Sequence, residues 1–110
     1  MKQSNFFVYI TCNLQRTVLY IGMTNNLQRR IHEHTENKGL VKTFAGRYYC
    51  HHLIYYECFQ SAAEAIAREK ELKKWRREKK EILIKQLNPS WRFLNEEVMQ
   101  WSRELSRSFW

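Results

Sequence analysis

Two apolar runs near the start of the chain predict a pair of β-strands. Residues 6–12 and 17–22 are rich in β-branched and aromatic side chains, and a short polar segment separates them. Such side chains suit a pleated, half-buried surface, and the polar segment suits a turn. The pattern therefore predicts a β-hairpin.

The register of this hairpin decides which side chains share a face. With the turn centred between Leu14 and Gln15, Tyr9 lies directly opposite Tyr20, so that the two phenols lie side by side. Because Leu-Gln is not the Asn-Gly type of sequence that fixes a tight turn, this register is an assumption.

A short helix is expected directly after the hairpin. Polar residues offer an N-cap before residues 27–34, where Leu27 and Ile31 form an inward stripe. Arg30 and His34 lie four residues apart on one flank of that stripe. Both side chains are therefore expected to point toward the hairpin.

The middle of the chain predicts a loop and then a third strand. Residues 35–47 include two glycines and show no sustained period, which is typical of a loop. The run 53–56, extended by His52 and Glu57, predicts a strand, for which a start near Tyr48 is an alternative.

Helical patterns fill the rest of the chain. Ser61 and Glu64 have the spacing of a capping box, so a helix starts there. A break is expected at 75–77, because one helix reaching 87 would be unusually long, and Asn88-Pro89 ends the second helix. A last helix carries an apolar seam formed by Leu94, Val98, Trp101 and Leu105.

Composition narrows the class of protein. The 110 residues suffice for one hydrophobic core, and the 44% apolar and 15% aromatic content favours a packed domain. A formal charge of +8 favours a polyanionic partner, for which nucleic acid is the natural candidate. The alternative is that the basic residues only solvate the surface.

Cysteine usage and hydropathy indicate a soluble, cytoplasmic protein. The three cysteines form no Cys-x-x-Cys spacing, so neither a disulfide framework nor a disulfide-linked partner is expected. The apolar stretch 6–10 is shorter than a signal or membrane segment. Cys50 with His51 and His52 leaves a zinc site as an alternative, which neighbours on opposite faces of an extended segment disfavour.

Glu69 is the most informative single residue. The inward stripe of its helix, Ala62, Ala65, Ile66 and Leu72, continues through position 69, which aims a carboxylate at the core. An ionised carboxylate there needs a nearby cation. Either an ion pair with a basic residue or a bound metal ion would meet this need.

Four linked motifs resemble the GIY-YIG nuclease domain. They are Phe7-Val8-Tyr9, Tyr20-Ile21-Gly22, Arg30 ten residues after Tyr20, and Glu69. Phe7 and Val8 stand where the family name has Gly and Ile, but the tyrosine is kept. The segment 67–75 is similar to the compact, single-domain bacterial branch, and the resemblance covers about residues 6 to 91.

This resemblance implies an α+β fold, with a three-stranded antiparallel sheet flanked by helices. We expect a nuclease domain over residues 1–94 and a helical extension over 95–110 packed on the same domain. It also implies that Glu69 ligates a single Mg²⁺ or Mn²⁺ ion and that Arg30 stabilises the charge that develops on the scissile phosphate.

The resemblance further implies that a phenol accepts the proton of the attacking water. We favour Tyr9 as this base and Tyr20 as a positioning hydroxyl, although a phenol needs a lowered pKa for that task. The alternative is that both are packed strand aromatics. His34 is a secondary catalytic candidate, with an ordinary surface histidine as its alternative.

The expected partner is nucleic acid, most simply DNA bound by a monomer that acts in repair or processing. The candidate contacts are Gly22, Lys42, Arg47, Lys73, Lys74 and Asn88, where Gly22 allows close approach of phosphate, although it could equally end a strand, and Asn88 could equally be only a helix terminator. The competing hypotheses are a binding protein without turnover and an interaction protein that uses Trp101, Phe109 and Trp110.

Overall fold

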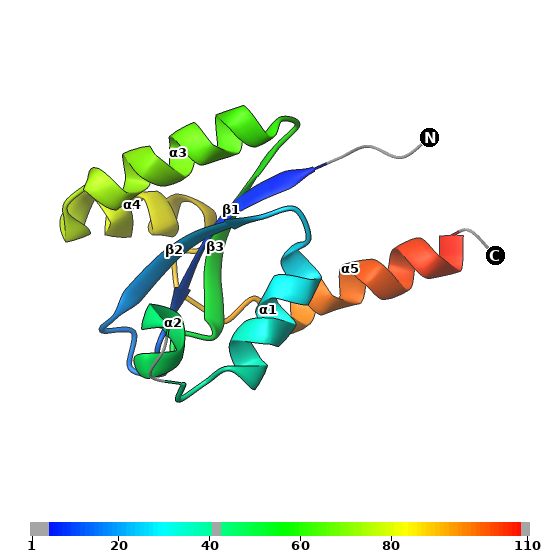
Figure 1. The fold of residues 1–110 in the computed structure, drawn as a ribbon, viewed down its shortest axis with the longest axis horizontal. Helices are drawn as coiled ribbons and strands as arrows, with labels where there is room; N and C mark the ends of the chain where they lie inside the picture. Colours follow the sequence, from blue (N-terminus) through cyan, green and yellow to red (C-terminus); the bar gives the residue numbers. More distant parts are fainter. Residues whose placement is uncertain (1–4, 41–42, 109–110) are drawn as a thin grey trace.

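The fold is built on a three-stranded antiparallel sheet. The computed structural model describes residues 5–40 and 43–108, with side chains up to Trp101. The strands lie in the order β2-β1-β3, so the first strand is central and β2 is an edge (Figure 1). The α+β class and the flanking helices are confirmed. The elements are β1 Phe6–Cys12, β2 Leu19–Thr24, α1 Leu27–Glu36, α2 Phe44–Arg47, β3 His52–Phe59, α3 Ala62–Lys74, α4 Arg77–Leu87 and α5 Asn95–Ser108.

Helices cover both faces of the sheet (Figure 1). Strand side chains alternate between the two faces, so Val8 and Ile10 pack with residues of α3 and α4, while Tyr9 packs with residues of α1 and α5. Leu27 of α1 and Val98 of α5 are fully buried in the second cluster. The candidate phenols therefore lie on the face that α1 covers.

The predicted hairpin is present, but its predicted register is wrong. Tyr9 pairs with Gly22, and Tyr20 pairs with Thr11, so the two tyrosines are diagonal neighbours rather than direct partners. The turn is longer than assumed because Asn13 organises it. The Asn13 Oδ1 accepts hydrogen bonds from the backbone N–H groups of Thr17 and Val18.

Several other predicted boundaries change. The segment predicted as a loop contains the short helix α2, which Thr43 caps by accepting a hydrogen bond from the Gly46 N–H. Strand β3 begins at His52, as the extended run predicted, and the alternative start near Tyr48 is wrong. Ile66, predicted to point inward, is 38% exposed, because α3 rests on the sheet through Ala65 and Leu72.

The remaining helix predictions are confirmed. Asn26 caps α1 by accepting from the Arg29 N–H, and Ser61 caps α3 by accepting from the Glu64 N–H. The break between α3 and α4 falls at Trp75 and Arg76. In α5, Val98 is buried and Trp101 packs edge-on against Tyr56. The predicted side chains at positions 105, 109 and 110 lie outside the described residues.

Candidate active site

Tyr9 is the centre of the candidate site. Its side chain is fully buried, and it crosses the neighbouring residue of β2, Gly22. A Cβ atom at Gly22 would lie 2.6 Å from Cζ of Tyr9 and 2.9 Å from Cε2 of Tyr20. The phenol can reach the edge of the sheet only because position 22 carries no side chain.

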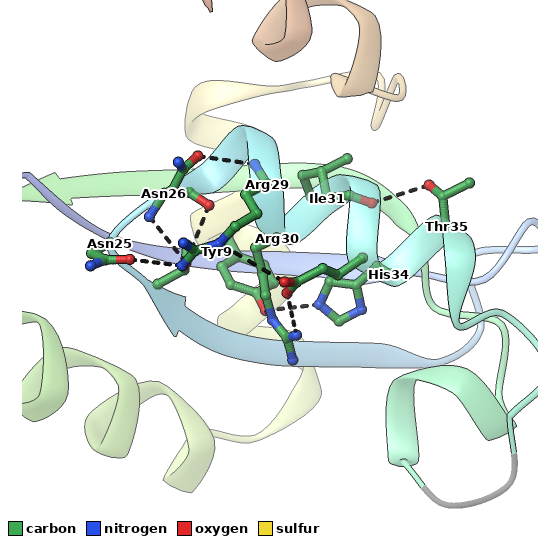
Figure 2. A network of polar contacts seen from close by, with 10 residues as sticks. Tyr9, Asn25, Asn26, Arg29, Arg30, Ile31, His34 and Thr35 are labelled. Atoms are coloured by element: carbon green, nitrogen blue, oxygen red, sulfur yellow. Dashed lines mark hydrogen bonds and ion pairs between the residues drawn. The ribbon is translucent and has the colours of Figure 1, made fainter.

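Two side chains of α1 hold the Tyr9 hydroxyl (Figure 2). The Arg30 Nε–H donates to the hydroxyl oxygen at 3.2 Å. The His34 Nε2 lies 2.8 Å from the same oxygen. With the Nδ1–H tautomer of His34, the phenolic proton is donated to Nε2 while the phenol oxygen accepts from Arg30. The expected flank of α1 does face the hairpin.

Burial shifts the pKa values of Tyr9 and His34. The pKa of Tyr9 is raised well above its ordinary value by burial and by the neighbouring Tyr20, and the hydrogen bond from Arg30 offsets only part of this. Burial and the charge of Arg30 lower the pKa of His34 to about 4. At neutral pH the site therefore holds a protonated phenol beside a neutral imidazole.

His34 is not the surface residue of the alternative interpretation. It is only 4% exposed, and its ring lies edge-on to Tyr9 and Tyr20 at centroid distances of 5.6 and 5.3 Å. A buried imidazole that contacts both candidate phenols has the geometry to exchange a proton with one of them.

Arg30 lies at the open side of this cluster. Its Nη1 donates to Glu33 Oε1 at 3.0 Å, and this bond to a residue one helical turn later on α1 orients the guanidinium. Arg30, Tyr20 and His34 line a small cavity of about 140 Å³ together with residues of α2. The adjacent Arg29 is exposed; it donates to Asn25 Oδ1 and lies 3.9 Å from the other oxygen of Glu33, but it does not line the cavity.

Tyr20 lies on the edge strand between two hollows. It lines the cavity of Arg30 and also a wider hollow of about 440 Å³ that includes Lys73 and Lys80. Its ring centroid is 6.2 Å from that of Tyr9. A phosphate at this edge would have the Arg30 guanidinium on one side and Lys73 of α3 and Lys80 of α4 on the other.

Glu69 approaches the same edge from α3. Its side chain is 22% exposed, and its carboxylate pairs with Lys73 Nζ at 3.2 Å. Because Lys73 lines the wider hollow together with Tyr20, this ion pair places the Glu69 carboxylate beside that hollow. The ion pair expected as an alternative is therefore formed, but with a lysine whose side chain is 55% exposed.

The carboxylate fits a hard divalent cation. The Glu69 carboxylate offers oxygen ligands, and the exposed Lys73 can be displaced from it. An ion bound there would take its other ligands from water and phosphate. Among the residues that the structure describes, no group of three or more His, Cys, Asp or Glu side chains gathers to form a closed metal cage.

The candidate nucleic-acid contacts lie in different surroundings. Lys74 and Arg47 are exposed. Asn88 is 3% exposed, and its amide donates to the Ile54 and Arg92 carbonyls and accepts from the Arg92 N–H. The geometry gives Asn88 a structural role in holding the chain after α4. Lys42 lies outside the described residues.

Two residues of the site escaped the sequence analysis. Glu33, which holds Arg30, could have been found from its i, i+3 spacing on a helix. Phe44 of α2 stacks on Tyr20 with ring centroids 6.2 Å apart. The sequence indicates the start of α2 only through Thr43, a possible N-cap residue, and an N-cap alone is weak evidence for a helix of one turn.

The described residues contain no helix long and apolar enough to span a membrane.

Comparison with known proteins gives one family. The family model of the GIY-YIG catalytic domain matches residues 5–82. A UPF0213 protein of Bacillus pumilus is 36% identical over 86 residues, or 78% of this chain and 84% of that protein. A UPF0213 protein of Haloquadratum walsbyi is 38% identical, with 78% and 92% covered. The solution NMR structure of a UPF0213 protein from Bacillus halodurans shares 36% identity and covers 73% of this chain and 82% of its own, with a TM-score of 0.45.

Proposed function

Because the chain belongs to the GIY-YIG family, we propose that it is a metal-dependent endonuclease that hydrolyses phosphodiester bonds in DNA during repair or processing. The observation that carries the proposal is the meeting of Tyr9, His34 and Arg30 at the sheet edge where Tyr20 shares a hollow with Lys73, the ion-pair partner of Glu69. A protein that only binds nucleic acid has no need of a carboxylate facing its polyanion.

Glu69 would hold a single Mg²⁺ or Mn²⁺ ion in place of Lys73. Such an ion, when bound, neutralises charge on the phosphate and favours loss of a proton from water. In its absence Lys73 compensates the carboxylate, which explains how Glu69 is tolerated in a half-buried position.

Arg30 would bind the scissile phosphate through the fork of donors that the cavity exposes. A planar guanidinium matches two phosphate oxygens, and the match improves as charge accumulates on them in the transition state. Glu33 keeps the guanidinium oriented before substrate arrives.

Tyr9 would receive the proton of the attacking water without first becoming a tyrosinate. As the water oxygen forms its bond to phosphorus, the water proton passes to the Tyr9 oxygen and the phenolic proton passes to Nε2 of His34. The bond to the leaving oxygen breaks, and that oxygen takes its proton from solvent. Through this relay Tyr9 never becomes a tyrosinate, and the proton ends on the imidazole of His34.

We further propose that the chain acts as a monomer and that residues 95–110 extend the same domain. Burial of Val98 against the cluster that contains Tyr9 supports this assignment, because it ties α5 to the side of the sheet that carries the site.

A cleavage assay tests the proposal. Purified protein is incubated with labelled single-stranded, duplex and flapped DNA and with matching RNA, each with Mg²⁺, with Mn²⁺ and with chelator. We expect cleavage of DNA that depends on the divalent ion and disappears with chelator. Tight binding without cleavage under every condition would instead favour the binding-protein hypothesis.

A further inference from the structure

Aromatic side chains lead from the candidate active site to the surface. Phe44 stacks on Tyr20, with an interplanar angle of 27°, and Tyr48 lies 4.8 Å from Phe44 between ring centroids. Phe44 is 51% exposed and Tyr48 is 43% exposed. Exposed rings in a continuous row are unusual on a surface without a binding role.

The row ends at a large hollow. This hollow of about 650 Å³ lies between the β1–β2 turn and the residues that follow α2, and Tyr48 and Tyr49 line it. Its volume is within the range of roughly 300–1,000 Å³ that is typical of small-ligand sites. Tyr49 has a positive φ of 58°, a backbone conformation that bulky L-residues rarely adopt.

The hollow also carries positive charge. Lys38 and Arg47 line it, and the lining residues that the structure describes include no Asp or Glu. His51 and His52 line it too, and burial lowers the pKa of both, which favours their neutral forms, so the positive charge of the hollow comes from Lys38 and Arg47. Aromatic faces beside unopposed cations match a nucleotide, whose base stacks while its phosphate pairs with a cation.

We propose that this hollow is a subsite for an unpaired nucleotide of the substrate strand. The proposal rests on the proposed nuclease function, and it names a substrate class: DNA with a single-stranded segment beside the cleaved bond. The strand would stack a base on Tyr48, set its phosphate against Arg47 or Lys38, and pass Phe44 to reach Tyr20 and Arg30. Bases paired in a duplex could not stack in this way, because their faces are already covered.

Binding measurements on a non-cleaving variant test the subsite. In the Glu69→Gln protein, affinity is measured for a single-stranded oligonucleotide carrying 2-aminopurine, for the blunt duplex of the same sequence, and for dAMP. We expect the single strand to bind at least tenfold more tightly than the duplex, with quenching of the 2-aminopurine fluorescence as the base stacks.

Substitution of Tyr48 provides the matched comparison. Tyr48→Ala should weaken single-strand binding about tenfold, as expected for loss of one base stack, and should leave duplex binding unchanged. Tyr48→Phe keeps the ring and should bind as the parent does. Ile82→Ala, an exposed apolar residue of α4, is the control for a surface change elsewhere. Thermal melts show that each variant is folded.

The outcomes separate the subsite from the nuclease. Equal binding of single strand and duplex, or an unchanged affinity in Tyr48→Ala, would overturn the proposal. Binding of dAMP as tightly as the strand would also overturn it and indicate a small-molecule pocket. Because the readout is binding and fluorescence, a wild-type protein that shows this pattern but cuts nothing would refute the nuclease function and leave the subsite standing.

Discussion

The buried contact between Tyr9 and His34 makes stability depend on pH. Unfolded chains bind the histidine proton with a pKa near 6.5, whereas folding lowers the pKa of His34 to about 4. As the pH falls from about 6.5 to 4, the unfolded state gains a proton that the folded state does not take up, so stability is lost in that window, by on the order of 2–3 kcal/mol.

Thermal melts from pH 7.5 to 4 measure this loss. His34→Gln should show a flatter dependence than the wild type. The exposed His32 on the same helix is the control, because His32→Gln should leave the dependence unchanged. The groups that act on His34 are Tyr9, Tyr20, Arg30, Glu33 and His51. Parallel curves for wild type and His34→Gln would contradict the assignment.

Arg30 and Arg29 are neighbours with different environments. Arg30 donates to Tyr9 and lines the small cavity, whereas Arg29 contacts Asn25 at the surface. Arg30→Ala should lower single-turnover cleavage at saturating DNA about 100- to 1,000-fold with little change in affinity, because the lost contacts strengthen in the transition state. Equal effects of Arg29→Ala and Arg30→Ala would show that Arg30 is not catalytic.

Glu69 distinguishes a metal ligand from a structural ion pair. Its partner Lys73 is largely exposed, and such pairs contribute only about 0–1 kcal/mol. Glu69→Gln should therefore leave the metal-free protein about as stable as the wild type, or slightly more stable, but abolish cleavage. Mg²⁺ should raise the Tm of the wild type and not that of the variant.

The matched control for Glu69 is Glu71→Gln on the same helix. Glu71 also pairs with a basic residue, Arg68, and is 54% exposed, so its removal tests an ordinary ion pair. If Glu69→Gln loses several kcal/mol of stability yet still cuts DNA, the carboxylate is structural and the proposed mechanism fails.

At the scale of elements, β2 can pack beside the Tyr9 side chain of β1 because Gly22 of β2 has no side chain. Gly22→Ala would place a methyl group within 2.6 Å of Cζ of Tyr9, whose ring is fully buried and has no room to move. Overpacking of this kind should destabilise by about 1–3 kcal/mol and displace the phenol from His34. In a Tyr9→Ala background the same substitution should cost little, and urea unfolding of the four proteins measures the difference. An equal cost in both backgrounds would show that strain within β2, and not the phenol, requires glycine.

The sequence predicted elements better than it predicted their alignment. The caps at Asn26 and Ser61 and the break after Lys74 depend on neighbouring residues, so local pattern sufficed for them. The hairpin register was missed because it depends on Asn13, whose side chain bridges the turn in a way that no propensity encodes.

In the candidate site, too, the residues could be named from the sequence but their contacts could not. Tyr9, Tyr20, Arg30 and Glu69 were named from spacing and family resemblance, which preserve order along the chain. The contact of His34 with Tyr9 could not be derived, since it joins residues 25 positions apart through tertiary packing. Helix α2 and its exposed Phe44 were missed because a single turn has too few residues to show a period.

At the scale of the whole molecule, charge should dominate binding. Basic residues lie along α3 and α4 and around the hollow beside α2, with no base-reading motif among them. The logarithm of the binding constant should fall linearly with the logarithm of salt concentration, by about 0.9 for each duplex phosphate neutralised. Lys74→Ala should reduce that slope by about one if Lys74 contacts a phosphate. An affinity that does not change with salt concentration, or that is much higher for one DNA sequence than for others, would exclude electrostatic, sequence-independent binding.

The strand order has a consequence for synthesis on the ribosome. Strand β1 is made first but lies between β2 and β3, and β3 ends at Phe59, about half the chain later. A nascent chain that has completed the hairpin still presents one edge of β1 with unpaired backbone groups, which invites pairing with another chain. A pause after residue 24 has emerged from the ribosome, but before residue 59 has emerged, should therefore favour aggregation, whereas a pause after residue 59 has emerged should not.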